Sequence, residues 1–418
     1  MKNALGPVAT LLIGVAILLT GSGLQGTLMP VRASIENFST FAIAVVGASY
    51  FLGFTVGCLK GGELVKNVGH VRVFLAMTAL ASAAPLIHGL VLDPITWSLL
   101  RFLTGFCFAI LYVVIESWLN ERSSNENRGV VFSTYVMITL TMTAAGQMIT
   151  LMYDPVGLEL FVIASVLVSV AAVPVALSKS QTPELPQETD VNLRRLLKIS
   201  PSGFFGCLAS GLTSGAFWSF APVFAAGSTN DISLVAWFMT AAVAGGAMGQ
   251  WPLGFLSDSL GRRKTLAISA GTAALVAAII VSTFGDVDFT GMVLLGAAWG
   301  FFSFPLYSIS VAHSNDHADP KDYVMVSSGL LLMYGLGATA GPFMASALMT
   351  LSNLSGLFLM TGVAHTVVAI YVLQRIFRRT SAPVEQHILF SDALATAHTA
   401  SHVCEEEVQS HRNPDNQD

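Results

Sequence analysis

Two ionisable residues, Arg101 and Glu116, lie within one apolar stretch, SLLRFLTGFCFAILYVVIESW. A charged side chain in hydrocarbon surroundings costs about 2.5–3.5 kcal/mol on insertion scales, so it normally faces a cavity or a partner. Arg101 can attract an anion or influence a nearby acid. Glu116 can carry a proton, because removal from water disfavours the charged form of a carboxyl group.

Helical geometry decides how these two residues can act together. At roughly 100° per residue they lie about 60° apart around one helix, with Tyr112 on the same stripe. Their separation along the axis is ~22 Å, which excludes a direct ion pair. Two alternatives stay open: Arg101 can bond carbonyl groups of adjacent helices, and Glu116 can pair with Arg122 or a loop near the helix end.

Softer candidates are polar or aromatic residues inside other apolar runs. Gln25 lies in the glycine-rich TGSGLQG, and Trp218 lies in the counterpart GLTSGAFW. For each aromatic residue, ordinary packing or a place at the membrane interface is the alternative. The further residues that could line the same site are Gln147, Gln250, Tyr307, Tyr50, Trp299 and Tyr334.

The elements that position these residues are membrane helices. The chain has 418 residues, of which 53% are hydrophobic and 11% charged, whereas ordinary soluble domains have roughly 25% charged residues. A bilayer span needs about 20 mostly apolar residues. We expect twelve spans, near residues 8–30, 41–61, 73–92, 95–120, 129–152, 158–177, 203–226, 233–256, 265–283, 289–312, 322–350 and 353–375.

The positions of the basic residues predict the orientation in the membrane. If both termini are cytoplasmic, all but two of the 20 basic residues fall on the cytoplasmic side; Arg32 lies outside and Arg101 lies in a span. This matches the positive-inside rule. The first apolar run has no Ala-x-Ala cleavage site and is long enough to span, so it reads as a helix rather than a signal peptide. We expect a multi-pass protein of the cytoplasmic membrane.

A polar stretch at 179–202 divides the chain into an N-terminal bundle of six helices (1–178) and a C-terminal bundle of six (203–376), followed by a polar cytoplasmic tail at 377–418. The two halves also carry identical residues at a constant offset in sequence number, which increases by three positions after Gly69–Gly261. The matches are Gly23–Gly215, Pro30–Pro222, Gly53–Gly245, Gly57–Gly249, Gly62–Gly254, Gly69–Gly261, Gly105–Gly300, Tyr112–Tyr307 and Gly146–Gly341. Such a duplication suits two bundles that rock about a central site, and small residues let helices pack closely.

One short loop occurs in both halves with a reversed charge. GFLSDSLGRRK follows the eighth span and contains Asp258, whereas GELVKNVGHVR follows the second span and has Lys66 at the equivalent position. The residues of interest in these loops are Gly62, Lys66 and Gly69 in the first copy, and Gly254, Asp258, Gly261, Arg262 and Arg263 in the second.

These loops resemble the cytoplasmic signature of the major facilitator superfamily, and LLRFLTGFCFA resembles its fourth-helix motif. LMPVRASIENFS, YFLGFTVG, VGHVRVF and IESWLNERSSNENRG are similar to the YcaD-like group. The resemblance implies an all-α transporter fold, in which the two loops form a cytoplasmic gate. In that gate the acid of each loop touches the start of a helix in the opposite half and helps to close the cytoplasmic side. Asp258 would then meet Arg128. Lys66 would meet the start of span eleven, where a cation opposes the helix dipole but Asp319 and Asp322 supply negative charge.

One departure from the superfamily concerns mechanism. Proton-coupled drug exporters carry a glycine-rich motif that ends in Gly-Pro on the fifth helix, whereas this chain has AAGQ, with Gln147 in place of proline. The segment of this chain that matches the motif better is GATAGP, which lies in span eleven and ends at Pro342. This weakens a drug/proton antiporter assignment without removing it.

We predict a secondary active transporter, a symporter or an antiporter, that moves a small organic solute by alternating access with proton coupling. The alternatives are a broad-specificity efflux antiporter or a non-transporting sensor. An enzyme would need clustered acidic or histidine residues, which the sequence lacks. We expect no cofactor, no metal site and no nucleic-acid partner, and a monomer in the lipid bilayer. His398, His402 and Cys404 in the tail lack an evident fourth ligand.

Overall fold

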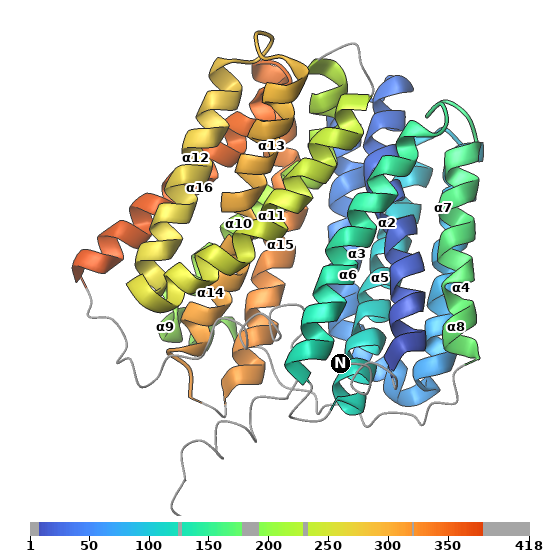
Figure 1. Cartoon of the computed structure of the whole chain (residues 1–418), viewed down its shortest axis with the longest axis horizontal. Helices are drawn as coiled ribbons and strands as arrows, with labels where there is room; N and C mark the ends of the chain where they lie inside the picture. Colours follow the sequence, from blue (N-terminus) through green and yellow to red (C-terminus); the bar gives the residue numbers. More distant parts are fainter. Residues whose placement is uncertain (1–7, 124–127, 178–191, 229–232, 320–321, 379–418) are drawn as a thin grey trace, which may run out of the picture.

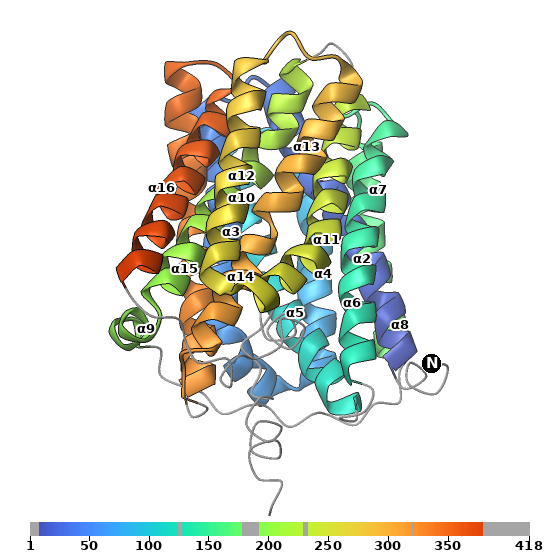
Figure 2. The same ribbon diagram turned by 60° about the vertical axis from the view of Figure 1, so that its left-hand side comes forward.

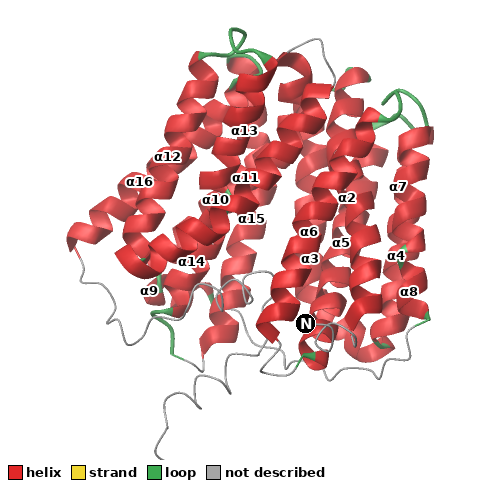
Figure 3. Cartoon of the chain, in the orientation of Figure 1, coloured by secondary structure: helices red, strands yellow, loops and turns green. Residues whose placement is uncertain are grey.

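The computed structural model describes residues 8–123, 128–177, 192–228, 233–319 and 322–378, and every regular element within these ranges is a helix (Figure 3). The first half contains α2 (Ala9–Ile35), α3 (Thr40–Val68), α4 (His70–Leu90), α5 (Pro94–Arg122), α6 (Arg128–Met148), the 3-10 turn η2 (Ile149–Leu151), α7 (Glu159–Val170) and α8 (Ala172–Ala176). The second half contains α9 (Leu193–Ile199), α10 (Pro201–Ser228), α11 (Ser233–Leu260), α12 (Arg262–Ser282), α13 (Phe289–Ser303), α14 (Pro305–Asn315), α15 (Tyr323–Leu351) and α16 (Gly356–Arg378).

The helices form two bundles that stand side by side (Figure 1). In the described part of the chain, 11 spans are long and apolar enough to cross a membrane, counting α7 with α8 and α13 with α14 as one span each. The remaining predicted span is α11, a continuous helix of 28 residues that contains several glycines, Gln250 and Pro252. The expected all-α architecture of two six-helix bundles is thus confirmed. The tail and most of the predicted linker lie outside the described residues.

The internal duplication is visible in how helices cross. A Cβ atom added to Gly53 would overlap the carbonyl oxygen of Phe102, and one added to Gly245 would overlap that of Ala297, the equivalent residue of the second half. Close backbone approach therefore requires glycine at both positions. Equivalent carbonyl contacts recur at Gly57 with Phe106, Gly249 with Phe301, Gly105 with Tyr50, Gly300 with Ala242, Gly23 with Thr143, Gly215 with Ala338, Gly146 with Thr20 and Gly341 with Leu212.

Helix starts are repeated as well. Asp93 caps α5 by accepting a hydrogen bond from the backbone N–H of Thr96 at 2.7 Å, and Asp288 caps α13 through Gly291 at 3.0 Å. Side-chain oxygen atoms at this position satisfy a backbone donor that the helix leaves free. The two halves thus use matching signals to place their fourth helices.

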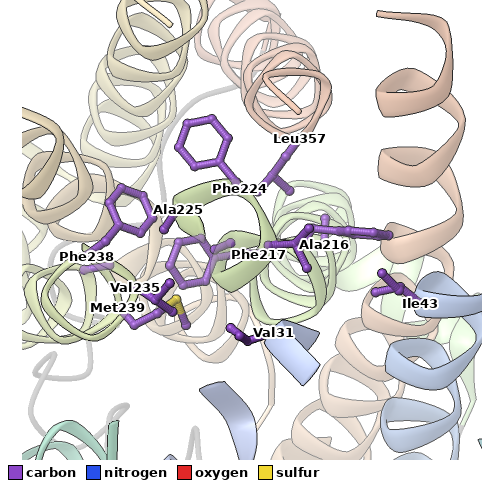
Figure 4. Packing of buried hydrophobic residues seen from close by; sticks show 14 of the residues in the cluster. Val31, Ile43, Ala216, Phe217, Phe224, Ala225, Val235, Phe238, Met239 and Leu357 are labelled. Carbon is purple, nitrogen blue, oxygen red and sulfur yellow. The ribbon is translucent and has the colours of Figure 1, made fainter. Parts of the chain in front are cut away.

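The two bundles touch mainly at one end. We call the end that carries α9 the linker end and the opposite one the far end; α2 begins at the linker end (Figures 1 and 2). Toward the far end, one cluster of buried apolar residues combines both halves, with Val31 and Ile43 beside Ala216 and Phe217 (Figure 4). Toward the far end α3 also packs on α15, where the rings of Phe41 and Phe343 are 5.9 Å apart.

At the linker end each half has its own core. The first half buries a cluster that includes Phe74 and Trp118, whereas the second half buries separate clusters around Leu266 and Met325. Figure 1 shows the lower ends of the two bundles splayed apart. The structure is therefore closed between the halves at the far end and separated at the linker end.

Candidate functional site

Glu116 is buried inside the first half, with 2% of its surface exposed. It lies three quarters of the way along α5, and the hydroxyl group of Tyr135 on α6 donates a hydrogen bond to its Oε1 at 3.2 Å. Burial of a carboxyl group is costly in its charged form. The hydroxyl group of Tyr135 thus bonds a buried carboxyl group, that of Glu116, which can exchange a proton.

Arg101 lies on the same helix, nearer the far end, and is partly exposed. Its Cζ atom is 4.3 Å from the ring centroid of Tyr50 on α3, which is a cation–π contact. In the described ranges no carboxylate pairs with Arg101, and no carbonyl group is recorded as its acceptor. The cation–π contact with Tyr50 is thus the contact that the described residues make with this guanidinium group, and its place in a cavity stays a prediction.

A row of aromatic rings connects the two ionisable groups. The rings of Tyr50 and Phe54 are 6.3 Å apart, and those of Phe54 and Tyr112 are 6.1 Å apart. Tyr112 precedes Glu116 by one helical turn, so the row runs from the arginine toward the carboxyl group. The stripe predicted on α5 is present, and α3 supplies the residues between its members.

The second half presents tyrosines toward this row. The rings of Tyr307 on α14 and Tyr334 on α15 are 5.0 Å apart. Tyr334 is within electrostatic reach of Tyr50, and Tyr307 is within reach of Glu116. The predicted residue Tyr307 and its repeat counterpart Tyr112 thus lie on either side of the same central region.

Three predicted glutamines each have a buried amide atom without a partner among the described residues. Gln147 on α6 is fully buried, and its Oε1 accepts a hydrogen bond from the hydroxyl group of Thr240 on α11 at 3.3 Å, which joins the two halves. Its Nε2, the Nε2 of Gln25 and the Oε1 of Gln250 are buried atoms with no hydrogen-bond partner among the described residues. Amide groups left in this way are open to a ligand or water.

Trp218 stacks on Phe304, with ring centroids 6.2 Å apart and planes at 2°. Phe304 is the residue that separates α13 from α14, so the tryptophan packs at a break in a membrane helix. This contact favours a packing role for Trp218 alongside the predicted binding role.

The gate loop of the second half contains a buried charge cluster. Arg262 donates from Nε to Asp316 at 3.0 Å and from Nη1 to Ser257 at 3.1 Å, and it also pairs with Asp258. Only 2% of the Arg262 side chain and 1% of the Asp316 side chain are exposed. Asp258 therefore bonds within its own half in this conformation.

The Lys66–Asp322 contact that was predicted across the gate is not formed here. Lys66 is exposed, and Asp322 pairs with Arg195 of α9 at 2.7 Å. Asp319 is exposed beside Asp322, and the side chain of Arg128 lies outside the described residues. The Asp258–Arg128 and Lys66–Asp322 contacts stay predictions for a conformation in which the linker ends meet. Of the other gate residues, Gly254 is buried, and Gly62 and Arg263 are partly exposed.

Sequence reasoning missed four residues of these sites: Tyr135, Thr240, Arg195 and Asp316. Asp316 could have been found, because the repeat aligns it with Glu121 and thereby places an acid at the end of the fourth span of each half. The partners of Glu116 and Gln147 lie on other helices, and no spacing along the chain indicates them. Within the described ranges, no three His, Cys, Asp or Glu residues are placed to hold a metal ion.

Two duplicated six-helix bundles with polar groups at their contact face define the class of polytopic membrane transporters. The sequence profile of the Major Facilitator Superfamily matches residues 11–201 and 203–401. The chain belongs to this superfamily, and its members are transporters rather than enzymes.

Known proteins similar to the chain agree with this assignment. It is 28% identical over 384 residues to the uncharacterized MFS-type transporter YcaD of Escherichia fergusonii, covering 90% of this chain and 98% of that one. The nucleoside transporter NupG superposes with a TM-score of 0.72 at 13% identity, covering 89% of this chain and 99% of NupG. The E. coli fucose:proton symporter FucP superposes with a TM-score of 0.56 at 16% identity, covering 90% and 99%.

Proposed function

We propose that this protein is a proton-coupled secondary active transporter that moves a small organic solute by alternating access. Glu116 carries the proposal, because it is a buried carboxyl group on a membrane helix and lies within electrostatic reach of Tyr307 of the second half. In its protonated form it is uncharged and compatible with the membrane interior. Tyr135 orients the carboxyl group, and the row from Tyr112 to Tyr50 leads to the solute site.

The arrangement of the halves supports alternating access. The glycine crossings make each half a tightly packed body, and the contacts between the halves gather at the far end. Two such bodies can rock about the central region and expose it to alternate sides. Thr240 and Gln147 would then separate while the two gate loops approach each other.

We propose further that the linker end faces the cytoplasm in the inner membrane and that the protein acts as a monomer. Lys60, Lys66, Arg72 and Arg122 lie toward the linker end, together with Arg194. This distribution supports the orientation by the positive-inside rule.

A flux screen in reconstituted vesicles tests the function. Wild-type protein should accumulate at least one class of small organic solute when a pH gradient is imposed, and a protonophore should abolish the accumulation. Glu116→Gln should lose accumulation against a gradient but retain solute exchange, because the amide keeps the shape of the side chain without titrating. Gradient-independent flux, or no flux for any broad solute class, would contradict the proposal.

A further inference from the structure

Arg101 is a cation inside a membrane helix with no acidic partner in the described part of the chain. The ion pairs that the described residues do form, such as Arg262 with Asp316 and Arg195 with Asp322, lie near helix ends. Glu116 cannot neutralise Arg101, because the two are separated along α5 by ~22 Å. An unpaired charge at this depth is costly unless a ligand or water compensates it.

The Cζ atom of Arg101 lies over the ring of Tyr50, 4.3 Å from its centroid, which is a cation–π contact. The described residues supply no carboxylate to the N–H groups of the arginine. A planar guanidinium group matches the two oxygen atoms of a carboxylate with parallel hydrogen bonds. The contact with Tyr50 thus prepares the arginine for a carboxylate instead of consuming its donors.

The surroundings of the arginine are aromatic. Phe54 and Tyr112 continue the row in the first half, and Tyr334 and Tyr307 oppose it from the second half. Aromatic walls favour a ligand with a flat apolar body through stacking and burial of apolar surface. We infer that Arg101 and Tyr50 bind the carboxylate of an aromatic organic monoanion, and that this anion crosses the membrane together with one proton on Glu116. This inference rests on the proposed function.

The charge of each group links the two ligands. In the loaded carrier the anion compensates Arg101 and the proton makes Glu116 uncharged, so neither group opposes passage through a closed, dry state. The anion alone leaves Glu116 charged, and the proton alone leaves Arg101 uncompensated, and either charge opposes that passage. The carrier is therefore expected to move one anion together with one proton.

Binding to the full-length protein in lipid nanodiscs tests the anion site. The probes are benzoate and 3-phenylpropionate, each compared with its uncharged amide, benzamide and 3-phenylpropanamide. Wild-type protein should bind the acids at least about tenfold more tightly than the amides, as expected for charge-assisted hydrogen bonds. Arg101→Gln should remove this preference, whereas Arg72→Gln, which removes an exposed cation at the linker end, should retain it.

A second variant guards against misfolding of Arg101→Gln. Tyr50→Leu should weaken benzoate binding, whereas Tyr50→Phe, which keeps the ring, should bind like wild type. Equal binding of acid and amide by wild type, an unchanged preference in Arg101→Gln, or no binding of either acid would overturn the inference.

Proton uptake separates this inference from the proposed function. In weakly buffered solution, benzoate binding should draw about one proton into wild-type protein and none into Glu116→Gln, by the linkage of proton and ligand binding. In vesicles a pH gradient, but not a membrane potential alone, should drive benzoate uptake. Gradient-driven uptake of uncharged solutes only would leave the proposed function intact and reject the anion site. Arginine-dependent benzoate binding without flux of any solute would leave the anion site intact and reject the proposed function.

Discussion

The gate loops of the two halves have the same backbone but different side-chain chemistry. Gly69 and Gly261 precede α4 and α12 with φ of 95° and 94°. After the glycine, the first half has His70, which is hydrogen-bonded to Ser117 at 2.9 Å, whereas the second half has Arg262 in its buried cluster with Asp258 and Asp316. The two loops thus share the backbone turn, but the second half has a network of charged residues where the first half has a neutral hydrogen bond.

This difference indicates which loop depends on charge for its stability. In the second half, removal of Arg262 would leave Asp316 buried without its main cation. In the first half, removal of the Ser117 hydroxyl group leaves an uncharged ring nitrogen or N–H. Breaking a buried ion pair is therefore expected to cost more than breaking a neutral hydrogen bond.

The largest effect is expected for Arg262→Met. It should lower the free energy of unfolding in mild detergent by about 3–5 kcal/mol, because it removes one partner of a buried ion pair. Denaturant titration followed by tryptophan fluorescence measures the change.

Three variants control this experiment. Lys264→Met, which removes an exposed cation two positions away, should have little effect. Ser117→Ala in the first half should cost only about 1 kcal/mol. Adding Asp316→Asn to Arg262→Met should recover part of the loss. Equal costs for Arg262→Met and Ser117→Ala would remove the proposed difference between the loops.

The shared backbone predicts an equal effect in both halves. Gly69→Ala and Gly261→Ala should each destabilise the protein by about 1–3 kcal/mol, because their φ and ψ values lie in a region that only glycine occupies readily. A Cβ atom at Gly261 would meet nothing within 4 Å, so strain alone accounts for the cost there.

Gly62→Ala is the matched control, since Gly62 lies in the interior of α3 with free space around it. It should leave stability unchanged or raise it by about 0.5–1 kcal/mol. Clearly unequal costs at Gly69 and Gly261 would show that the surrounding charges, rather than the turn itself, determine the loop's stability.

The smallest effect is expected from the exposed charges of the gate. Lys66→Asp should shift the balance toward the conformation in which the linker ends are apart and slow transport, since an exposed ion pair contributes about 0–1 kcal/mol. Adding Asp322→Lys should restore part of the rate if Lys66 and Asp322 pair when the linker ends meet.

Asp322 also holds Arg195 in the present conformation, which requires its own control. Arg195→Gln removes that pair alone and reports the effect of releasing α9 from α15. If the double variant transports no better than Lys66→Asp, the pairing across the gate is rejected.

Much of the fold could be predicted from the sequence because it depends on local patterns. Span lengths, the basic residues and the repeated glycines indicated two six-helix bundles, and the glycines make the backbone contacts that the repeat implied. The candidate site was predicted less completely. Arg101, Tyr112 and Glu116 share one helix and so share a periodicity, whereas Tyr50 and Tyr135 contact them from other helices.

The gate partners could not be read from spacing for another reason. Asp258 pairs with Arg262 and Asp322 with Arg195 while the linker ends are apart. The contacts across the gate are predicted for another conformation, which neither one sequence nor one structure contains. Different partners in different states are what alternating access requires.

A pair of distances tests alternating access most directly. Spin labels at Asn67 and Lys264 report on the linker end, and labels at Leu92 and Asp286 report on the far end; all four positions are exposed. We predict that lowering the pH from alkaline to mildly acidic shifts the two distances in opposite directions in wild-type protein and leaves both unchanged in Glu116→Gln. Distances that stay fixed in wild type, or that lengthen together, would contradict the account.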